Sequence, residues 1–90
     1  MSSPPERIVK NEARLDILCC LVDGPPLTIA QLSARVGTSL TAVAYHVKLL
    51  ETHDLVRKTG ETDNEEPLFA APLDEHDEWL REAVEVHRRG

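Results

Sequence analysis

Two helical segments of this sequence are joined by so few residues that their packing is strongly restricted. Thr28 has the features of a helix N-cap, and Gln31 stands three residues later as its partner in a capping box. The helix is expected to end at Gly37, because glycine enters the left-handed conformation at little cost. Ser39 then caps a second helix that continues to about Thr52. A connection this short makes the two helices cross steeply, as in a helix-turn-helix unit.

The remaining segments complete a single small domain, since ninety residues cannot build more than one sizeable core. A first helix is expected from about Ser3 to Val22, before a stretch of glycine and proline that breaks it. Two short strands, 55–59 and 67–71, enclose a polar loop and predict a β-hairpin. The predicted fold is mainly α with a small β-hairpin, in the order helix, helix, helix, hairpin, helix. Within the domain 1–90, the expected ranges are about 28–53 for the helix-turn-helix unit, about 55–71 for the hairpin and about 74–89 for the last helix.

The charge distribution draws attention to the helix-turn-helix unit. The formal net charge of −6 argues at first against nucleic-acid binding, because nucleic-acid binders usually carry basic patches. Residues 24–58, however, carry four basic and two acidic side chains, whereas the segments before and after them are net acidic. The local field at a docking surface matters more than the total charge. The sequence therefore leaves DNA binding open for this region.

Other classes of protein find little support in the sequence. Cys19 and Cys20 are adjacent, so a disulfide between them would be strained, and we expect reduced core residues in a cytoplasmic protein. No apolar run is long enough to span a membrane, and the start MSSPPER lacks the basic and apolar regions of a secretory leader. A glycine-rich phosphate loop, paired cysteine ligands and a nucleophile–base grouping are all missing. We therefore expect no enzyme and no catalytic residues.

The helix that begins after Ser39 has two unlike faces. Its branched apolar residues recur at helical spacing and belong in a core, whereas Thr41, Tyr45 and Lys48 share the other face. An α-helix fits the major groove of DNA, where Thr41 would meet a base or a thymine methyl and Lys48 a phosphate or guanine. Ala44 beside them allows close approach. The alternative is an ordinary solvated helix face. The candidate DNA-binding residues are Thr28 (near a phosphate), Ser39, Leu40, Thr41, Ala44, Tyr45, Lys48, Arg57 and Lys58.

The stretch LTIAQLSARVGTSLTAVAYHVKLLETHDLVRKTG resembles the winged helix-turn-helix of ArsR-type bacterial repressors. The family pattern is Leu-Ser/Thr-x-x-Glu-Leu-Ala, then Leu-Ser-x-x-x-Val-Ser-x-His-Leu-x-x-Leu, then Gly-Leu-Val. The matching positions are Thr28, Leu32, Ser39, Val43, His46, Val47, Leu50, Leu55 and Val56. With the first and last helices included, the resemblance covers nearly the whole chain. It implies a repressor of transcription that reads a palindromic operator in double-stranded DNA, with His46 packed inside the motif rather than reading a base.

The resemblance also implies a symmetric homodimer built from the first and last helices. Such an interface would explain why the first helix carries two apolar stripes, where a lone surface helix needs only one. The residues expected at the interface are Ile17, Leu21, Trp79, Leu80, Ala83 and Val84.

Two features depart from the family pattern. Asp54 replaces the usual glycine before Leu-Val, although aspartate tolerates a left-handed turn better than most residues. The tip of the hairpin, which forms the wing, is often basic in the family but carries Glu61, Asp63, Glu65 and Glu66 here. Carboxylates at that position would repel phosphates. Either the wing stays clear of the DNA, or the domain is a protein-interaction module whose acidic wing and last helix bind a basic partner without touching DNA.

Zinc is the one cofactor that the resemblance brings into question. The family's thiolate site near the recognition helix has no cysteine here, but a second family site has the pattern Asp-x-His-x10-His-x2-His or Glu. Asp74, His76 and His87 fit its first three places, and Gly90 takes the fourth. One helix cannot bring both histidines to one ion. A twofold dimer could bring His87 of one subunit close to Asp74 and His76 of the other. The alternative is that Asp74 is a cap and the histidines are solvated.

Overall fold

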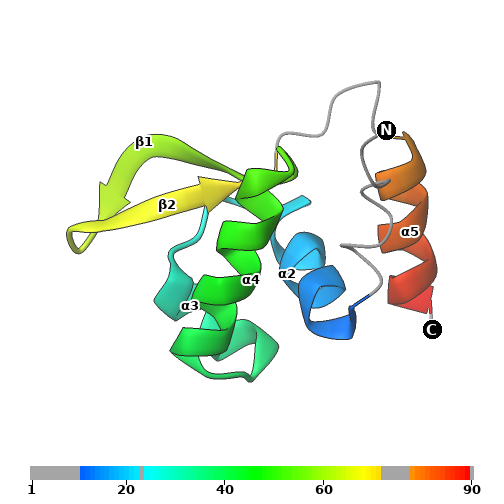
Figure 1. Ribbon diagram of the computed structural model, residues 1–90, viewed down its shortest axis with the longest axis horizontal. Helices are drawn as coiled ribbons and strands as arrows, with labels where there is room; N and C mark the ends of the chain where they lie inside the picture. The colour runs from blue at the N-terminus through cyan, green and yellow to red at the C-terminus, as the bar shows by residue number, and fades with distance from the viewer. Residues whose placement is uncertain (1–10, 23, 72–77, 90) are drawn as a thin grey trace.

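The computed structural model describes residues 11–22, 24–71 and 78–89, with the exception of the Trp79 side chain. The elements are α2 (Glu12–Val22), α3 (Ile29–Val36), α4 (Leu40–Thr52), β1 (Arg57–Asp63), β2 (Glu66–Ala70) and α5 (Glu78–Arg89). This is the predicted order, and Figure 1 shows the hairpin and α5 on opposite sides of the domain. The prediction of one helix over about 3–22 is wrong, because Asn11 is not helical and its side chain accepts a hydrogen bond from the Arg14 N–H at 3.2 Å at the start of α2. Ser3 and Asp74, the predicted helix start and the predicted cap, lie outside the described residues.

The link between α3 and α4 confirms the predicted capping in detail. The Thr28 hydroxyl accepts a hydrogen bond from the Gln31 backbone N–H at 3.1 Å, and the Gln31 side chain accepts one from the Thr28 N–H at 3.0 Å. Gly37 follows α3 in the left-handed conformation, with φ 78°. Ser39 caps α4 by accepting a hydrogen bond from the Ala42 N–H at 3.1 Å. These local bonds determine where both helices begin and where α3 ends.

The wing is longer and its turn tighter than the sequence suggested. The prediction of a polar loop over 60–66 is wrong, because β1 extends to Asp63 and only two residues join it to β2. Those residues, Asn64 and Glu65, have positive φ values of 53° and 66°, as in the type I′ turns that match the twist of a hairpin. Asp54, before the wing, also has a positive φ, of 60°, as the sequence led us to expect.

Backbone hydrogen bonds tie the wing to the start of the helix-turn-helix unit. Leu27 and Phe69 exchange a pair of them, from Leu27 N to Phe69 O at 3.0 Å and from Phe69 N to Leu27 O at 2.8 Å. Nearer the tip, the Gln31 side chain donates a hydrogen bond to the Asp63 carboxylate at 2.9 Å. The wing is thus held at two points, one just before α3 and one on it.

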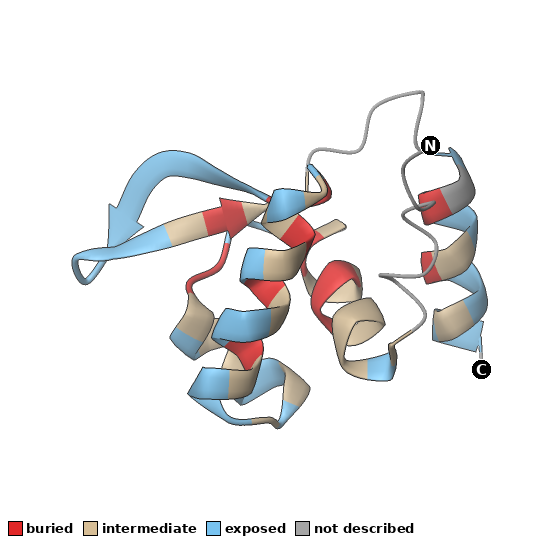
Figure 2. Ribbon diagram, in the orientation of Figure 1, coloured by how far each residue is buried: buried red, intermediate tan, exposed pale blue. Residues whose placement is uncertain are grey.

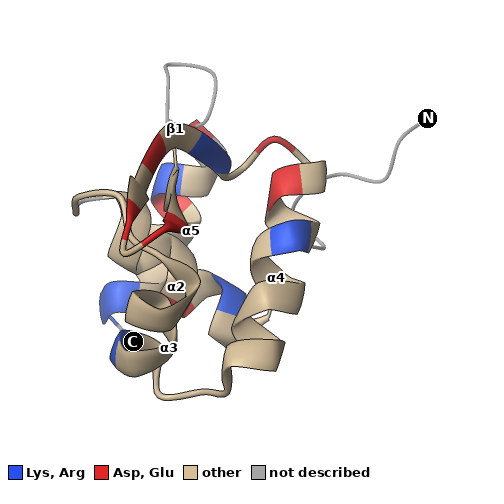
Figure 3. Ribbon diagram, turned by 90° about the vertical axis from the view of Figure 1, so that its left-hand side faces the viewer, with Lys and Arg blue, Asp and Glu red and all other residues tan. Residues whose placement is uncertain are grey.

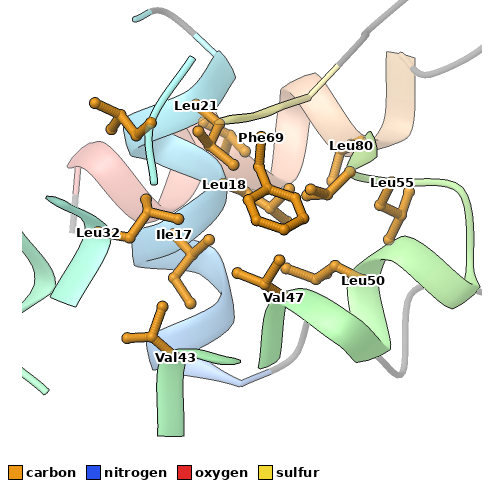
Figure 4. Close-up of a cluster of buried hydrophobic side chains, with 13 residues drawn as sticks. Ile17, Leu18, Leu21, Leu32, Val43, Val47, Leu50, Leu55, Phe69 and Leu80 are labelled. Carbon is orange, nitrogen blue, oxygen red and sulfur yellow. The ribbon is translucent and has the colours of Figure 1, made fainter. Parts of the chain in front are cut away.

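The core lies around α2, which contacts α3, α4, α5 and β2. In Figure 2, buried residues line the facing sides of the helices, and Figure 4 shows Phe69 of the wing lying among side chains of α2 and α4. Burial of a large apolar side chain contributes about 1.5–3 kcal/mol, so a cluster of this size is the main source of stability. The buried apolar residues are Ile17, Leu18, Leu21, Leu27, Leu32, Val43, Val47, Leu50, Leu55, Val56, Phe69, Leu80 and Val84.

This core corrects most of the predicted dimer interface. Ile17, Leu21, Leu80 and Val84 are at most 3% exposed in the single chain, so they pack within it and are not available to a partner. Because α2 packs against α3, α4, β2 and α5 of the same chain, more than one of its sides is covered, which explains two apolar stripes without a dimer. Of the other predicted residues, Ala83 is half-buried and the Trp79 side chain lies outside the description.

Polar contacts add to the packing of α5 on α2. The His87 Nε2 atom lies 2.6 Å from the Asp16 carboxylate, and the Arg88 guanidinium donates a hydrogen bond to the Cys19 carbonyl at 3.2 Å. None of the described helices has both the length and the apolar character needed to cross a membrane.

Candidate nucleic-acid interface

The outward face of α4 is open to solvent along its whole length. Leu40 is 56% and Tyr45 is 61% exposed, and Thr41, Ala44 and Lys48 are also exposed. These five residues recur at helical spacing, so they form one continuous surface, which we call the α4 outer face. The expectation that Thr41, Tyr45 and Lys48 point away from the core is confirmed.

The opposite face of α4 holds the helix firmly in the domain. Val43, Val47 and Leu50 are at most 1% exposed and belong to the common core. Because these side chains are locked in a packed interior, the orientation of α4 is set before any ligand arrives. A surface presented in a fixed orientation suits recognition of a rigid partner such as duplex DNA.

A side-chain contact from α2 also supports α4. The Arg14 Nε–H donates a hydrogen bond to His46 Nδ1 at 3.1 Å, and the His46 ring packs edge-on against Tyr45 with 5.5 Å between ring centroids. Burial, and after it the charge of Arg14, lowers the pKa of His46 below its ordinary value. His46 is therefore a neutral, half-buried packing residue, as the resemblance implied. Sequence analysis missed Arg14, because a partner 32 residues away leaves no periodic signal.

Thr52 is a second residue that sequence analysis missed. It is exposed one helical turn after Lys48, and its hydroxyl donates a hydrogen bond to the Lys48 carbonyl at 2.9 Å. The spacing i, i+4 from Lys48 would have placed it on the same face, so the helical period was the signal available.

Thr28 does not offer the phosphate contact that we expected. The residue is only 3% exposed, and its hydroxyl and its backbone N–H are both used in the capping box with Gln31. Because the residue is almost completely buried, its hydroxyl is out of reach of an external phosphate. The prediction for Thr28 is corrected, whereas Ser39 is exposed at the start of α4.

The wing divides into a basic base and an acidic tip. Arg57 and Lys58 are exposed at the start of β1, while the carboxylates that follow are exposed towards the turn. Figure 3 shows acidic residues along the hairpin and basic residues at the start of β1 and on α4. Cations are thus available where β1 leaves the core, and repulsion of phosphates is expected at the tip.

The predicted metal ligands are not brought together by the described part of the chain. Asp74 and His76 lie outside the described residues, and His87 faces Asp16 of its own chain. Within residues 11–22, 24–71 and 78–89, no three histidine, cysteine or carboxylate side chains gather closely enough to hold an ion. His87 and Asp16 would supply only two donors, whereas a zinc site uses three or four protein ligands. Zinc binding across a dimer stays a prediction.

The two cysteines behave as packing residues. Both are free thiols and half-buried on α2, and Cys19 lies 3.9 Å from the Val84 carbonyl of α5. Burial raises the pKa of both thiols, which keeps them protonated and unreactive near neutral pH.

Comparison with known proteins agrees with this geometry. A family model described as winged helix-turn-helix DNA-binding matches residues 10–57. Among solved structures, reduced HlyU from Vibrio cholerae is similar with a TM-score of 0.72 and 25% identity, over 93% of this chain and 81% of that one. The transcriptional repressor BigR from Xylella fastidiosa has a TM-score of 0.73 and 12% identity, over 90% of this chain and 77% of that one.

A third similar structure was determined with its ligand present. ZitR from Lactococcus lactis, in complex with DNA, has a TM-score of 0.67 and 19% identity, over 87% of this chain and 52% of that one. No curated protein matches the sequence. The family model covers more than half of the chain and includes α2, α3 and α4. The chain belongs to the winged helix-turn-helix DNA-binding family.

Proposed function

We propose that this protein is an ArsR-type transcriptional repressor that reads a palindromic operator as a homodimer. The observation that carries the proposal is the α4 outer face, which is exposed along the whole helix and fixed by a buried opposite face. An α-helix of this kind enters the major groove with its N-terminal half against the base edges. Ser39, Leu40, Thr41 and Ala44 then face the bases, with Tyr45 and Lys48 at the groove wall.

The phosphate contacts in this proposal come from the cations beside α4. Lys48 on the helix and Arg57 and Lys58 at the start of β1 are exposed and carry the positive charge of the region. The wing tip stays clear of the DNA backbone, because its carboxylates would be repelled there. The hydrogen bond from Gln31 to Asp63 helps to hold the tip in its position against α3.

A second copy of the chain completes the operator-binding unit. A twofold dimer presents two α4 helices to successive major grooves, with half-sites roughly 34 Å apart. The surface that we assign to the partner is the outward side of α5, where Val86 is 62% exposed and Ala83 is half-buried. Bound in the cytoplasm to a promoter, such a dimer blocks transcription by occupying the site. BigR, which has the same fold, is described as a repressor.

The exposed carboxylates of the wing favour a second candidate function. Glu61, Asp63, Glu65 and Glu66 are all exposed on one hairpin, which would suit a basic protein partner. In that case the wing and α5 would bind the partner and α4 would remain unoccupied. Only the first function predicts DNA binding, with an affinity that falls as the salt concentration rises.

Binding to the upstream region of the protein's own gene, followed by fluorescence anisotropy at several salt concentrations, tests the proposal. Specific binding falls steeply with salt, and Lys48→Ala reduces the log–log slope by about one if Lys48 neutralises one phosphate. Arg35→Ala is the matched control, because Arg35 is an exposed cation in the last turn of α3, outside the α4 outer face, the wing and the α5 surface assigned to the partner. Absence of binding at low salt, or equal slopes for Lys48→Ala and the wild type, would contradict the proposal.

A further inference from the structure

We infer that α4 selects its DNA sequence through the methyl groups of thymine rather than through hydrogen bonds to guanine or adenine. The inference rests on the DNA-binding function proposed above and names the kind of half-site that it takes. The duplex that it predicts has thymines opposite the N-terminal half of α4.

In the N-terminal half of the α4 outer face, most of the exposed side-chain atoms are carbon atoms. Leu40 is 56% exposed, and Ala44 and the methyl-bearing Thr41 are exposed beside it. The hydroxyl of Ser39 already accepts a hydrogen bond from the Ala42 N–H. The surface that would meet the bases therefore offers mostly methyl groups, with the hydroxyls of Ser39 and Thr41 as its polar groups.

The side chains that read purines are missing from this part of the helix. Bidentate recognition of guanine needs arginine or lysine, and that of adenine needs asparagine or glutamine. Residues 39–47 contain none of these four, nor any carboxylate that could accept from cytosine. His46 does not fill the gap, because its Nδ1 accepts from Arg14 and its ring is half-buried. The thymine C5 methyl is the base feature that an apolar surface can recognise in the major groove.

The placement of exposed apolar side chains supports the same conclusion. Among the described residues, the exposed large hydrophobics are Leu40, Tyr45 and Val86, and two of the three lie on the α4 outer face. Lys48 on that face, with Arg57 and Lys58 at the start of β1, complements phosphates rather than an apolar protein surface. An apolar strip beside cations matches the thymine methyls and flanking phosphates of a major groove.

The test compares thymine with deoxyuridine, which differs only in lacking the C5 methyl. Duplexes selected by the protein from a randomised 30-base-pair pool give the preferred half-site, and each thymine is then replaced singly by deoxyuridine. Loss of a buried methyl should weaken binding by about three- to fivefold at the positions that face α4. Half-sites with guanine at those positions, no enriched sequence at all, or equal affinity for thymine and deoxyuridine would overturn the inference.

Variants of α4 assign the effect to named side chains. Leu40→Ala and Thr41→Ser should each bring the ratio of thymine to deoxyuridine affinity close to one at the base that the altered side chain faces. Thr41→Val should leave that ratio unchanged, because valine retains the methyl group. Thr62→Ser is the matched control, since Thr62 is an exposed threonine near the wing tip, which stays clear of the DNA in the proposed function. Thermal unfolding of each variant verifies the fold. Failure of the protein to bind any duplex at low salt would count against the proposed function, whereas binding that ignores the methyl would count against this inference alone.

Discussion

The α4 outer face and the wing are joined to the same core, yet they present opposite surfaces to a polyanion. The α4 face is neutral except for Lys48, and its side chains are short enough for close approach. The wing carries two cations where it leaves the core and four exposed carboxylates towards its tip. A shared fold therefore does not give its parts a shared role, because charge decides which part meets the phosphates.

The largest expected effect on DNA affinity comes from placing a negative charge, like those at the wing tip, on α4. Ala44→Glu places a carboxylate in the centre of the α4 outer face, where it would face base edges and phosphates, and should weaken DNA binding by about 100-fold. Fluorescence anisotropy with the selected duplex measures the loss. Ala34→Glu adds the same charge at an exposed alanine of α3 and should have little effect. Equal losses for the two variants would mean that α4 has no special place in binding.

Two glycines with positive φ, one between the helices and one within β1, allow the stability of the regions to be compared. Gly37 between α3 and α4 has φ 78°, Gly60 in the wing has φ 92°, and a Cβ at either position would meet no atom within 4 Å. The cost of Gly37→Ala and Gly60→Ala is therefore conformational, about 1–2 kcal/mol each. Urea unfolding measures both. A much larger cost at Gly37 would show that the turn between the helices tolerates less adjustment than the wing does.

Reversing a negative charge on the wing should strengthen DNA binding, the opposite of adding one to α4. Glu61→Lys or Glu65→Lys removes a repulsive carboxylate and adds a cation, so DNA binding should tighten by about three- to tenfold at low salt. Glu12→Lys is the control, because Glu12 is exposed at the start of α2, outside the wing, the α4 outer face and the α5 surface assigned to the partner. Unchanged affinity for both wing variants would place the wing out of reach of the backbone. Loss of a captured basic partner would instead favour the protein-interaction function.

The smallest expected effect is on the pH dependence of the unfolding free energy. It involves His46 of α4, which accepts a hydrogen bond from Arg14 of α2. Because the pKa of His46 is lowered in the folded state, the unfolded chain binds a proton more readily at mildly acidic pH. The contribution of His46 to stability is thus fully present above its ordinary pKa and declines as the pH falls through the histidine range towards the lowered value. His46→Gln should flatten this part of the curve of unfolding free energy against pH. Lys58→Gln on the wing should leave it unchanged.

The parts of the fold that depend on neighbouring residues could be predicted from the sequence. The bounds of α3 and α4 follow from Thr28, Gly37 and Ser39, whose side chains or backbone conformations act within a few residues. The exposed position of Thr41, Tyr45 and Lys48 follows from the helical period alone. Each of these features requires no knowledge of the rest of the chain.

Features that depend on distant partners could not be predicted in the same way. The apolar stripes of α2 indicate burial, but the pattern is the same whether α5 of the same chain or a second chain covers them. Thr28 is buried next to Leu27, which pairs with Phe69 far away in the sequence, and its neighbours in the sequence do not indicate that burial. The two-residue turn of the wing contains Glu65, a residue without the left-handed preference that marks such turns.

The pairing of Leu27 with Phe69 has a further consequence for the wing. It gives β2 a neighbour on each side, so that β1 is the strand with an open edge in the described part of the sheet. An open edge invites strands of other molecules to add to it, and charged side chains are the usual protection against such growth. Every residue of β1 is exposed, and four of its seven, Arg57, Lys58, Glu61 and Asp63, are charged. Whatever else the wing carboxylates do, they help to keep separate copies of the protein from stacking into insoluble sheets.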